Sequence, residues 1–425
     1  MIDIKQIRDN PQKFKDACEA KRFNVDIDGL LEADAGLRAA KQQLQDISTD
    51  KNRIGKSIPK LSPDEKQPAL SELAELKKRE ARHDQAVREL QPQLDELMQQ
   101  VAQPADDDVP LGADDTENVE IRKEGRIRQF DFEPKDHVQL GMALGIIDIE
   151  RGVKLAGTRN YFLKGDGALL HWAVLRFAMD LMVEKGYVPL SVPLLMKDEA
   201  MRGTGYYPGS EDQTYRMEKD ELNLVGTAEV PLTAYRMGEI LDAAELPLKY
   251  AAISSCFRRE AGAAGKDTYG LYRIHQFDKV EQVVICENSA EASANFHNEI
   301  LANAEAVMRA LELPYRVANV CTGDLGRGQA KKFDIEAWMP SRNNYCETHS
   351  ASKFYEFQAR RMNLRYKDPG AKKNVFCHTL NNTVIASPRI LIPILELYQN
   401  PDGSVTIPNV LRQYMNGKEK IDKSS

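Results

Sequence analysis

Four side chains that could bind a ligand lie in two neighbouring segments of the second half of the chain. Arg258 and Glu260 end one run that is expected to form a strand, and Phe277 and Glu281 belong to the next. Residues two apart share one face of a strand, so all four groups could line one surface of an antiparallel sheet. An arginine can bind a phosphate in a bidentate way, an aromatic ring can stack on a base, and a carboxylate can accept a hydrogen bond from an exocyclic amine. The spacing predicts an ATP site on a sheet, and a salt-bridged sheet face is the alternative interpretation.

A glycine-rich stretch between these two strands could suggest a phosphate-binding loop. Such a loop has the pattern GxxxxGK followed by Ser or Thr. Here Glu260 stands where the first glycine should be, five residues before Gly265, and Asp267 follows Lys266 in place of the hydroxyl residue. No GxGxxG pattern follows a predicted strand either. The sequence therefore indicates neither a P-loop nor a dinucleotide-binding fold.

Composition narrows the class of protein. A chain of 425 residues with 42% hydrophobic and 29% charged residues is typical of a globular protein of two or three domains. The net charge of -7 excludes a surface coated with basic residues but permits a local basic patch. No apolar run reaches the ~18 residues of a membrane span, and the start MIDIKQIRDNPQKF has no apolar core of a secretory signal. We therefore expect no membrane partner. The six cysteines are scattered, which predicts reduced thiols in the cytoplasm.

The first hundred residues follow a heptad pattern. In the stretches 30–58 and 73–101, steps of three and four alternate, and apolar residues fill eight of nine and seven of nine positions. This spacing is typical of a coiled-coil seam. Three prolines between residues 58 and 68 should stop the first helix. The pattern predicts two antiparallel helices of ~30 residues, each ~45 Å long.

The end of this helical hairpin carries local positive charge. The stretch KNRIGKSIPK has four basic residues and no acid: Lys51, Arg53, Lys56 and Lys60. Contacts from Lys and Arg to phosphates release counterions, and double-stranded RNA is recognised largely by its shape and backbone. We expect these four residues to bind RNA. On the heptads alone, a dimerisation or spacer coiled coil is the alternative.

A stretch rich in proline and acid, QPADDDVPLGADDTEN, separates the two halves and is typical of a linker. The predicted division is a helical arm domain over 1–105, a linker over 106–118 and a second domain over 119–425. In the second domain, helical and strand-like segments alternate, which predicts an α+β fold. The expected helices are 171–185, 290–312 and 353–362, and the expected strands include 250–260 and 271–287.

Five segments of the second half, together with the arm, resemble the seryl-tRNA synthetase family of class II aminoacyl-tRNA synthetases. FRREAGAAGKDTYGLYRIHQFDKVE resembles the second class II motif, and GYVPLSVPLL, which holds Pro193, resembles the first. VGTAEVPL resembles the loop that binds serine. YCETHSASKFYEFQARRMNLRY and HTLNNTVIASPRI resemble the remaining ATP segment and the third motif. The resemblance covers nearly the whole chain, in order, and implies a catalytic domain built on an antiparallel sheet flanked by helices.

The resemblance implies a role for each matching residue in binding ATP. Arg258 matches the arginine that holds the α-phosphate and the serine carboxylate. Glu260 and Phe277 match the residues that contact the adenine amine and stack on the adenine ring, and Arg389 matches the arginine at the γ-phosphate. The full implied ATP-binding set is Arg258, Arg259, Glu260, Ile274, Phe277, Glu347, Thr348, His349, Ser350 and Arg389. Glu347 and Ser350 are also the implied ligands of an Mg²⁺ ion bound with ATP.

The resemblance likewise implies a serine pocket. Its residues are Thr227, Ala228, Glu229, Arg258, Glu281 and Thr383. Arg258, Glu281 and Arg389 form the implied catalytic set. Two departures stand out: position 259 is Arg where many relatives have Ser, and NNTVIASPR lacks the glycines of some class II third motifs. The absence of clustered Cys and His residues leads us to expect no protein-bound zinc of the kind found in some archaeal seryl enzymes.

The resemblance implies an enzyme that joins serine to tRNA(Ser). Members of the family usually charge tRNA(Sec) as well, where that tRNA exists, and the resemblance implies a homodimer. Two other classes of function are alternatives. One is a ligase that loads an amino acid onto a carrier protein, but such relatives lack the arm. The other is an inactive paralogue that binds RNA, which should have lost a residue such as Arg258, Glu260, Glu281 or Arg389.

Overall fold

The chain folds into two compact units. The structure, a computed structural model, describes residues 1–262 and 269–423. One unit is Ile2–Ala102, and the other is Gln103–Ser425 together with Met1. The described residues contain no helix long and apolar enough to cross a membrane.

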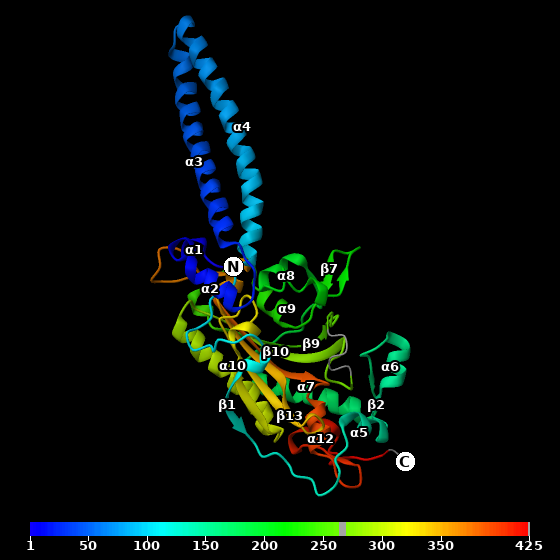
Figure 1. Cartoon of the computed structure of the whole chain (residues 1–425). Coiled ribbons are helices and arrows are strands. Elements are labelled where there is room, and N and C mark those ends of the chain that lie inside the picture. The colour runs from blue at the N-terminus through cyan, green and yellow to red at the C-terminus, as the bar shows by residue number, and fades with distance from the viewer. Residues whose placement is uncertain (263–268, 424–425) are drawn as a thin grey trace. The chain divides into compact units, whose positions relative to one another are not determined.

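The N-terminal unit consists of two short and two long helices (Figure 1). The short helices are α1 (Ile4–Asp9) and α2 (Pro11–Ala20). The long helices, α3 (Ile27–Ser57) and α4 (Pro63–Gln100), run antiparallel, as the heptads predict. Ile47, Ile54 and Leu76 form a buried cluster between them. Burial of this apolar seam, rather than helix propensity, stabilises such long helices.

The reversal between the long helices is shorter than predicted. It consists of the 3₁₀ turn Ile58–Lys60 and two further residues, and α4 begins at Pro63. Proline suits the first helical position because its missing N–H would have no partner there. Glu65 accepts a hydrogen bond from the backbone N–H of Ser62 at 2.9 Å and so caps the start of α4. The expected break up to residue 68 is wrong, because Pro68 lies inside α4.

The second unit is built on one large sheet whose strands follow the order β1-β11-β12-β13-β16-β10-β9-β4. Every pairing is antiparallel except that of β4 with β9. This confirms the predicted α+β fold with an antiparallel sheet. The strands are β1 (Val119–Glu124), β4 (Val188–Pro189), β9 (Leu248–Phe257), β10 (Gln276–Cys286), β11 (Tyr315–Asn319), β12 (Lys331–Met339), β13 (Asn344–Tyr355) and β16 (His378–Ser387).

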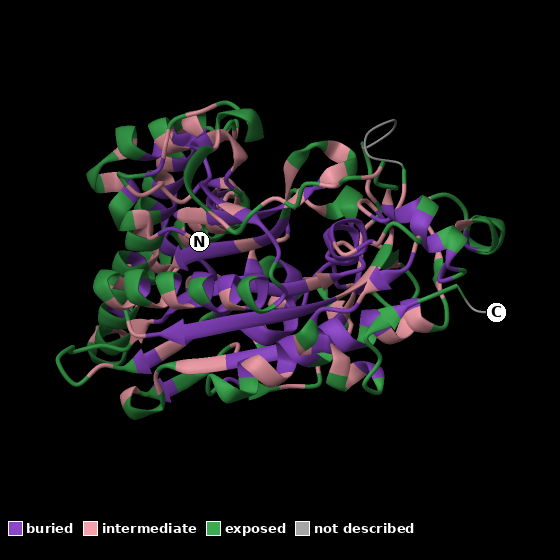
Figure 2. Ribbon diagram, turned by 90° about the horizontal axis from the view of Figure 1, so that it is seen from below, coloured by how far each residue is buried: buried purple, intermediate pink, exposed green. Residues whose placement is uncertain are grey.

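The two faces of the central strand β10 have different neighbours. Val280 and Val284 belong to the main core, where α7 (Asp166–Glu184) and α10 (Ala290–Ala310) cover the sheet. On the other face, Val283 and Ile285 pack in a second cluster with residues of α9 (Glu229–Ala234) and α11 (Phe357–Met362). Figure 2 shows the central strands as the most buried part of this unit. The second face of β10 also carries Phe277, Lys279 and Glu281, because side chains alternate along a strand.

Smaller elements surround the sheet. The remaining helices of the described residues, apart from short 3₁₀ turns, are α5 (His137–Ala143), α6 (Ile149–Ala156), α8 (Asp198–Thr204), α12 (Leu391–Leu397) and α13 (Asn409–Arg412). The remaining strands form small sheets: β2 (Ile147–Asp148) with β3 (Phe162–Leu163), β5 (Leu195–Lys197) with β7 (Leu222–Leu224) and β6 (Arg216–Met217), β8 (Ile240–Asp242) with β14 (Arg365–Lys367) and β15 (Val375–Phe376), and β17 (Val405–Thr406) with β18 (Lys420–Ile421).

Three expected segments differ in extent. The strand expected over 250–260 ends at Phe257, so Arg258 and Glu260 follow it rather than belong to it. The strand expected over 271–287 begins only at Gln276. The helix expected over 353–362 is α11 alone, because β13 continues to Tyr355. Side-chain alternation therefore holds for Phe277 and Glu281 but does not explain how Arg258 and Glu260 reach the same place.

The acidic stretch after the arm packs closely within the second unit. Lys353 binds the carboxylate of Asp106 at 2.5 Å, and the hydroxyl of Tyr355 donates to the same residue at 2.9 Å. Val109 is buried against Val320 and a neighbouring leucine. The start of the predicted linker is therefore held against β13. The glycine-rich residues Gly265, Lys266 and Asp267 lie outside the described residues.

Candidate active site

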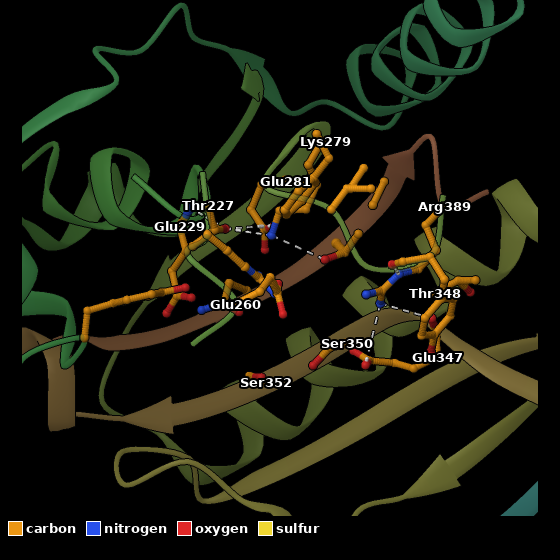
Figure 3. Close-up of a pocket in the computed structure, with 18 of the residues that line it drawn as sticks. Thr227, Glu229, Glu260, Lys279, Glu281, Glu347, Thr348, Ser350, Ser352 and Arg389 are labelled. Atoms are coloured by element: carbon orange, nitrogen blue, oxygen red, sulfur yellow. Dashed lines mark hydrogen bonds and ion pairs between the residues drawn. The ribbon is translucent and has the colours of Figure 1, made fainter. Parts of the chain in front are cut away.

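One pocket lies on the face of the sheet that carries Phe277, Lys279 and Glu281 (Figure 3). It gathers residues from β10, β13, β16 and the loops that follow β9 and β16. Twelve of the residues predicted for the site line it: Thr227, Glu229, Arg258, Glu260, Ile274, Phe277, Glu281, Glu347, Thr348, Ser350, Thr383 and Arg389. Segments more than 150 residues apart in the sequence thus meet in one cavity.

An arginine and an aromatic ring face each other in this pocket. The guanidinium carbon of Arg258 lies 5.2 Å from the centre of the Phe277 ring, which is a cation–π distance. Nε of Arg258 donates to the carbonyl of Gly226 at 3.4 Å, and its backbone N–H donates to His275 at 3.0 Å. The last bond extends the pairing of β9 and β10 by one step beyond Phe257. It explains how Arg258 is held in place beyond the end of the strand.

Glu260 has an unusual backbone conformation next to Arg258. Its φ of +53° is in the left-handed region, which is costly for a residue with a side chain. Two arginines hold it there: Arg273 binds its carboxylate at 2.9 Å, and Arg159 donates to its carbonyl at 3.3 Å. The carboxylate is thus oriented by a specific partner at the edge of the pocket.

The inner end of the pocket is polar and buried. Thr383 lies opposite Glu281 in the pairing of β16 with β10. Lys279 forms an ion pair with Glu281, and its Nζ donates to Thr227 at 2.6 Å and lies 3.5 Å from the hydroxyl of Thr383. Figure 3 shows Lys279 extending beside Glu281 and Thr227. This end can bind a small molecule that carries both an ammonium and a hydroxyl group.

Glu229 provides a second carboxyl group near Glu281. Gln358 donates to it at 2.8 Å. Burial, followed by the charge of Glu281, raises the pKa of Glu229 to about 7. At neutral pH this carboxyl group is close to its titration midpoint, so an incoming cation would favour its ionised form.

Oxygen donors and a further arginine lie at another part of the pocket. Arg389 approaches Glu347 to 3.8 Å and lies over the ring of Tyr272, 4.4 Å from its centre. Burial would raise the pKa of Glu347, but Arg389 and Lys332 hold it below its ordinary value. The hydroxyl of Ser350 lines the same region (Figure 3). Carboxylate and hydroxyl oxygens beside an arginine suit a phosphate chain with a divalent cation.

A buried carboxylate next to Ser350 adds to this oxygen-rich region. Asp334 lies opposite Ser350 in the pairing of β12 with β13, and its Oδ1 is buried without a hydrogen-bond partner. Hard cations such as Mg²⁺ prefer such oxygen ligands and keep several waters. The donor set therefore fits a hydrated Mg²⁺ ion, although the described residues contain no cluster of three His, Cys, Asp or Glu able to bind a metal by themselves.

Three predicted residues do not line this pocket. Ala228 is fully buried just before α9, and the side chain of Arg259 is exposed. His349 is buried with its Nδ1 2.8 Å from the hydroxyl of Thr348, and burial lowers its pKa to about 4. The roles expected for the Arg259 and His349 side chains have no support from this arrangement.

Sequence reasoning missed several residues that line the pocket: Tyr206, Leu271, Tyr272, Lys279, Gln329, Ser352, Asn381 and Ala386. Lys279 could have been predicted, because it lies between Phe277 and Glu281 and the alternation of side chains along the strand places it on the same face. Tyr272 and Tyr206 lie in loops, where no periodicity indicates the direction of a side chain. A second cavity adjoins the first and shares Arg258 and Glu229 with it.

The four basic residues near the turn of the arm have different surroundings. Lys51 bridges the two long helices through an ion pair of 2.6 Å with Glu80. Arg53 lies 3.1 Å from Asp50 on its own helix. Lys56 and Lys60 are exposed and form no ion pair with the described residues. The last two are thus the most available for a phosphate backbone.

Comparison with known proteins agrees with this geometry. The family model "Seryl-tRNA synthetase N-terminal domain" matches residues 1–103, and "tRNA synthetase class II core domain (G, H, P, S and T)" matches residues 213–398. The serine--tRNA ligase of Deinococcus radiodurans is 44% identical over 421 residues, which cover 99% of each chain. The serine--tRNA ligase 1 of Streptomyces avermitilis is 42% identical, again with 99% of each chain covered. The crystal structure of seryl-tRNA synthetase from Pyrococcus horikoshii complexed with ATP superposes with a TM-score of 0.94 at 36% identity and full coverage of both chains.

Proposed function

The chain belongs to the seryl-tRNA synthetases, which are class II aminoacyl-tRNA synthetases, and from its activity as a serine--tRNA ligase we propose the roles of its residues. The reaction has two steps. A carboxylate oxygen of serine attacks the α-phosphorus of ATP, and pyrophosphate leaves with the electrons of the broken P–O bond. A terminal ribose hydroxyl of tRNA then attacks the carbonyl of seryl-adenylate, and AMP leaves. Both steps depend on positioning and on neutralising charge, and neither needs a covalent enzyme intermediate.

Phe277, Arg258 and Glu260 bind the nucleotide in this proposal. The ring of Phe277 stacks on adenine, the guanidinium of Arg258 binds the α-phosphate, and the carboxylate of Glu260 accepts from the adenine amine. The main support for this proposal is that these groups line one cavity with Glu281 and Thr383. The ion pair between Glu260 and Arg273 supports this role, because a carboxylate that is already oriented loses less entropy on binding.

Thr227, Glu229, Glu281 and Thr383 bind serine. The carboxylates of Glu229 and Glu281 bind its ammonium group, and Thr383 with Glu281 binds its hydroxyl. Glu281 and Thr383 are buried, so bound alanine, which has no hydroxyl, would leave unmade the hydrogen bonds that these two residues form with the serine hydroxyl. Sites of this kind reject the analogue that lacks the hydroxyl by ~10⁴ to 10⁵.

Glu347 and Ser350 hold Mg²⁺ together with the phosphates of ATP, and Arg389 binds the γ-phosphate. When bound, the ion screens the negative charge of the phosphates. Arg389 is positioned for its task by Tyr272, whose carbonyl accepts from its Nε at 3.3 Å. The resulting group of positive charges stabilises the pyrophosphate as it leaves.

The arm binds tRNA(Ser), and tRNA(Sec) where that tRNA exists, chiefly through Lys56 and Lys60. The second cavity, next to Arg258, offers room for the 3′ end of the tRNA. We propose that the protein works in the cytoplasm, together with these substrates. A carrier-protein ligase would lack the arm, whereas a domain of this type matches residues 1–103.

The protein works as a homodimer in this proposal. Apolar side chains in and near the segment that resembles the first class II motif are exposed in the single chain: Trp172, Val188, Leu195 and Ile253. An exposed apolar group of this kind is typical of a protein interface. Light scattering of the purified protein tests the expected mass of two chains.

Amino-acid-dependent exchange of pyrophosphate into ATP tests the assignment of the pocket. Each of the twenty amino acids is assayed separately with wild-type protein and with Arg258→Ala as the inactive control. Exchange with serine alone supports the proposal. A folded protein that exchanges pyrophosphate with no amino acid, or with a different one, would contradict it.

A further inference from the structure

Lys279 is a buried cation at the centre of the proposed serine pocket. Its side chain is 8% exposed, and that of its ion-pair partner Glu281 is 2% exposed. Its ammonium group also donates to the hydroxyl of Thr227 and lies near that of Thr383. Lys279 thus contacts three residues that are expected to bind serine, yet it has no part in the roles proposed above. A buried charge is costly unless it is paired, so its place inside a substrate pocket needs an explanation.

The position of Lys279 along β10 indicates which part of the substrate it meets. Phe277, Lys279 and Glu281 follow one another on one face, and β10 pairs with β9 without interruption from Gln276 to Ile285. At 3.2–3.4 Å per residue, Lys279 is about 7 Å from each of the other two along the strand. If Phe277 stacks on adenine and Glu281 binds the serine ammonium, Lys279 lies between them. The carboxylate of serine and the α-phosphate of ATP must meet in this interval.

We propose that Lys279 is a substrate-binding residue that exchanges its partner when serine enters. In the empty pocket its ammonium group is paired with Glu281. When serine binds, the substrate ammonium takes over Glu281, and Lys279 turns to the substrate carboxylate. This inference rests on the proposed function of the pocket and adds to it a contact for the one charged group of serine that otherwise shares Arg258 with ATP.

The exchange keeps the buried charges balanced. Serine enters as a zwitterion with one positive and one negative group, and the ion pair between Lys279 and Glu281 offers the opposite charge to each. One buried ion pair becomes two, so Lys279 and Glu281 each keep a partner of opposite charge. The hydroxyls of Thr227 and Thr383 are released at the same moment, so Thr383 becomes available for the serine hydroxyl.

The experiment compares serine with serinol, which keeps the ammonium and hydroxyl groups but has no carboxylate. Calorimetry gives the dissociation constants of both for the wild type, for Lys279→Met and for Lys279→Arg. In the wild type we expect serine to bind more tightly than serinol. In Lys279→Met we expect this preference to fall by about 10- to 100-fold, which is the effect of losing one charged hydrogen bond. Lys279→Arg keeps the charge and should retain most of the preference.

A structural role of Lys279 would give a different result. If Lys279 only stabilised the pocket, Lys279→Met would weaken serine and serinol binding by the same factor, and an unchanged ratio would overturn the proposal. Should Lys279→Met fail to fold because Glu281 has lost its partner, the double variant Lys279→Met/Glu281→Gln removes both charges. It affects the ammonium contact of both ligands equally, so the ratio still reports on the carboxylate. Wild-type protein that does not bind serine at all would instead contradict the proposed function itself.

Discussion

Glu281 and Thr383 lie directly opposite each other on the paired strands β10 and β16 at the buried end of the pocket. One accepts hydrogen bonds and the other can both donate and accept. A ligand hydroxyl placed between them can therefore be satisfied on both sides. They are about a hundred residues apart in the sequence, and the pairing of the two strands brings them together.

The first prediction concerns Glu281. Glu281→Gln keeps the shape of the side chain but removes the charge that faces the substrate ammonium. We expect serine-dependent pyrophosphate exchange to fall at least ~100-fold, because buried charge-assisted hydrogen bonds are lost, while ATP binding stays within about twofold. Exchange kinetics and ATP calorimetry measure the two effects. Glu336→Gln, on strand β12 of the same sheet and outside the pocket lining, is the control. Normal exchange by Glu281→Gln would refute the assignment.

The second prediction is a pH dependence caused by Glu229. Its pKa is raised to about 7, so the carboxyl group is increasingly protonated and neutral below that pH. Serine binding then requires loss of this proton, and KM for serine should rise as the pH falls, approaching tenfold per unit well below pH 7. Above pH 7 it should level off. Glu229→Gln should bind serine more weakly, with a KM that does not change with pH in this range. A wild-type KM for serine that does not rise below pH 7 would contradict the role of Glu229.

The raised pKa of Glu229 also makes the stability of the fold depend on pH: a higher pH favours serine binding but lowers the contribution of Glu229 to the free energy of unfolding. Because the folded state holds the Glu229 proton more tightly than the unfolded chain, this group stabilises the fold most below its ordinary pKa of 4.5. Its contribution to the free energy of unfolding decreases as the pH rises from there through about 7. Denaturant titrations of wild type and Glu229→Gln should differ in this interval, with the variant showing a weaker decrease.

The third prediction concerns Arg273, which orients Glu260. Arg273→Ala should raise KM for ATP by about tenfold, since Glu260 must then be ordered by the nucleotide itself. KM for serine should stay unchanged. Arg412→Ala, which removes an exposed ion pair with Glu419, is the control. Equal effects on ATP and serine would indicate a general loss of structure instead of a lost orientation.

The fourth prediction separates the arm from the chemistry. Lys41 and Gln91 contact each other across the two long helices at 2.8 Å, so a short glycine linker can join them in place of residues 42–90. We expect this shortened protein to form seryl-adenylate at the wild-type rate but to lose tRNA charging. Exchange and aminoacylation assays measure the two activities. Normal charging of tRNA by the shortened protein would show that the arm is not needed to bind it.

The fifth prediction distinguishes the basic residues of the arm. Lys56→Ala/Lys60→Ala should weaken tRNA binding and lower its salt dependence, with a change in the slope of log K against log salt of about 0.7 to 0.9 per lost phosphate contact. Lys51→Ala should change this slope less, because Lys51 is already paired with Glu80, and should mainly lower the melting temperature of the arm. Filter binding at several salt concentrations provides the slopes. Equal slopes for the double variant and wild type would exclude both lysines from the interface.

The sequence predicts well where periodicity controls the structure. The heptads indicate both long helices, and alternation in β10 places Phe277 and Glu281 on one face. The sequence predicts the structure poorly where the chain leaves helices and strands. Arg258 and Glu260 reach the pocket through an extra backbone bond and a left-handed residue held by arginines, neither of which has a periodic signal. The predicted extent of the turn between the two arm helices was wrong for a related reason: the effect of a proline depends on its place in the helix.

The alternation in β10 has a further consequence for the substrate. In the proposed binding mode, the spacing of Phe277, Lys279 and Glu281 along the strand sets a fixed distance, here called the ruler, from the base of the nucleotide to the amino group of the amino acid. An isomer such as isoserine, whose amino group is one carbon farther from the carboxylate, would be out of step with this ruler. A shift of one residue would disrupt this spacing, because it would bring Asp278, Val280 and Gln282 into the pocket and move Glu281 into the main core. Point substitutions keep this alternation, whereas an insertion or deletion of a single residue within the strand reverses it.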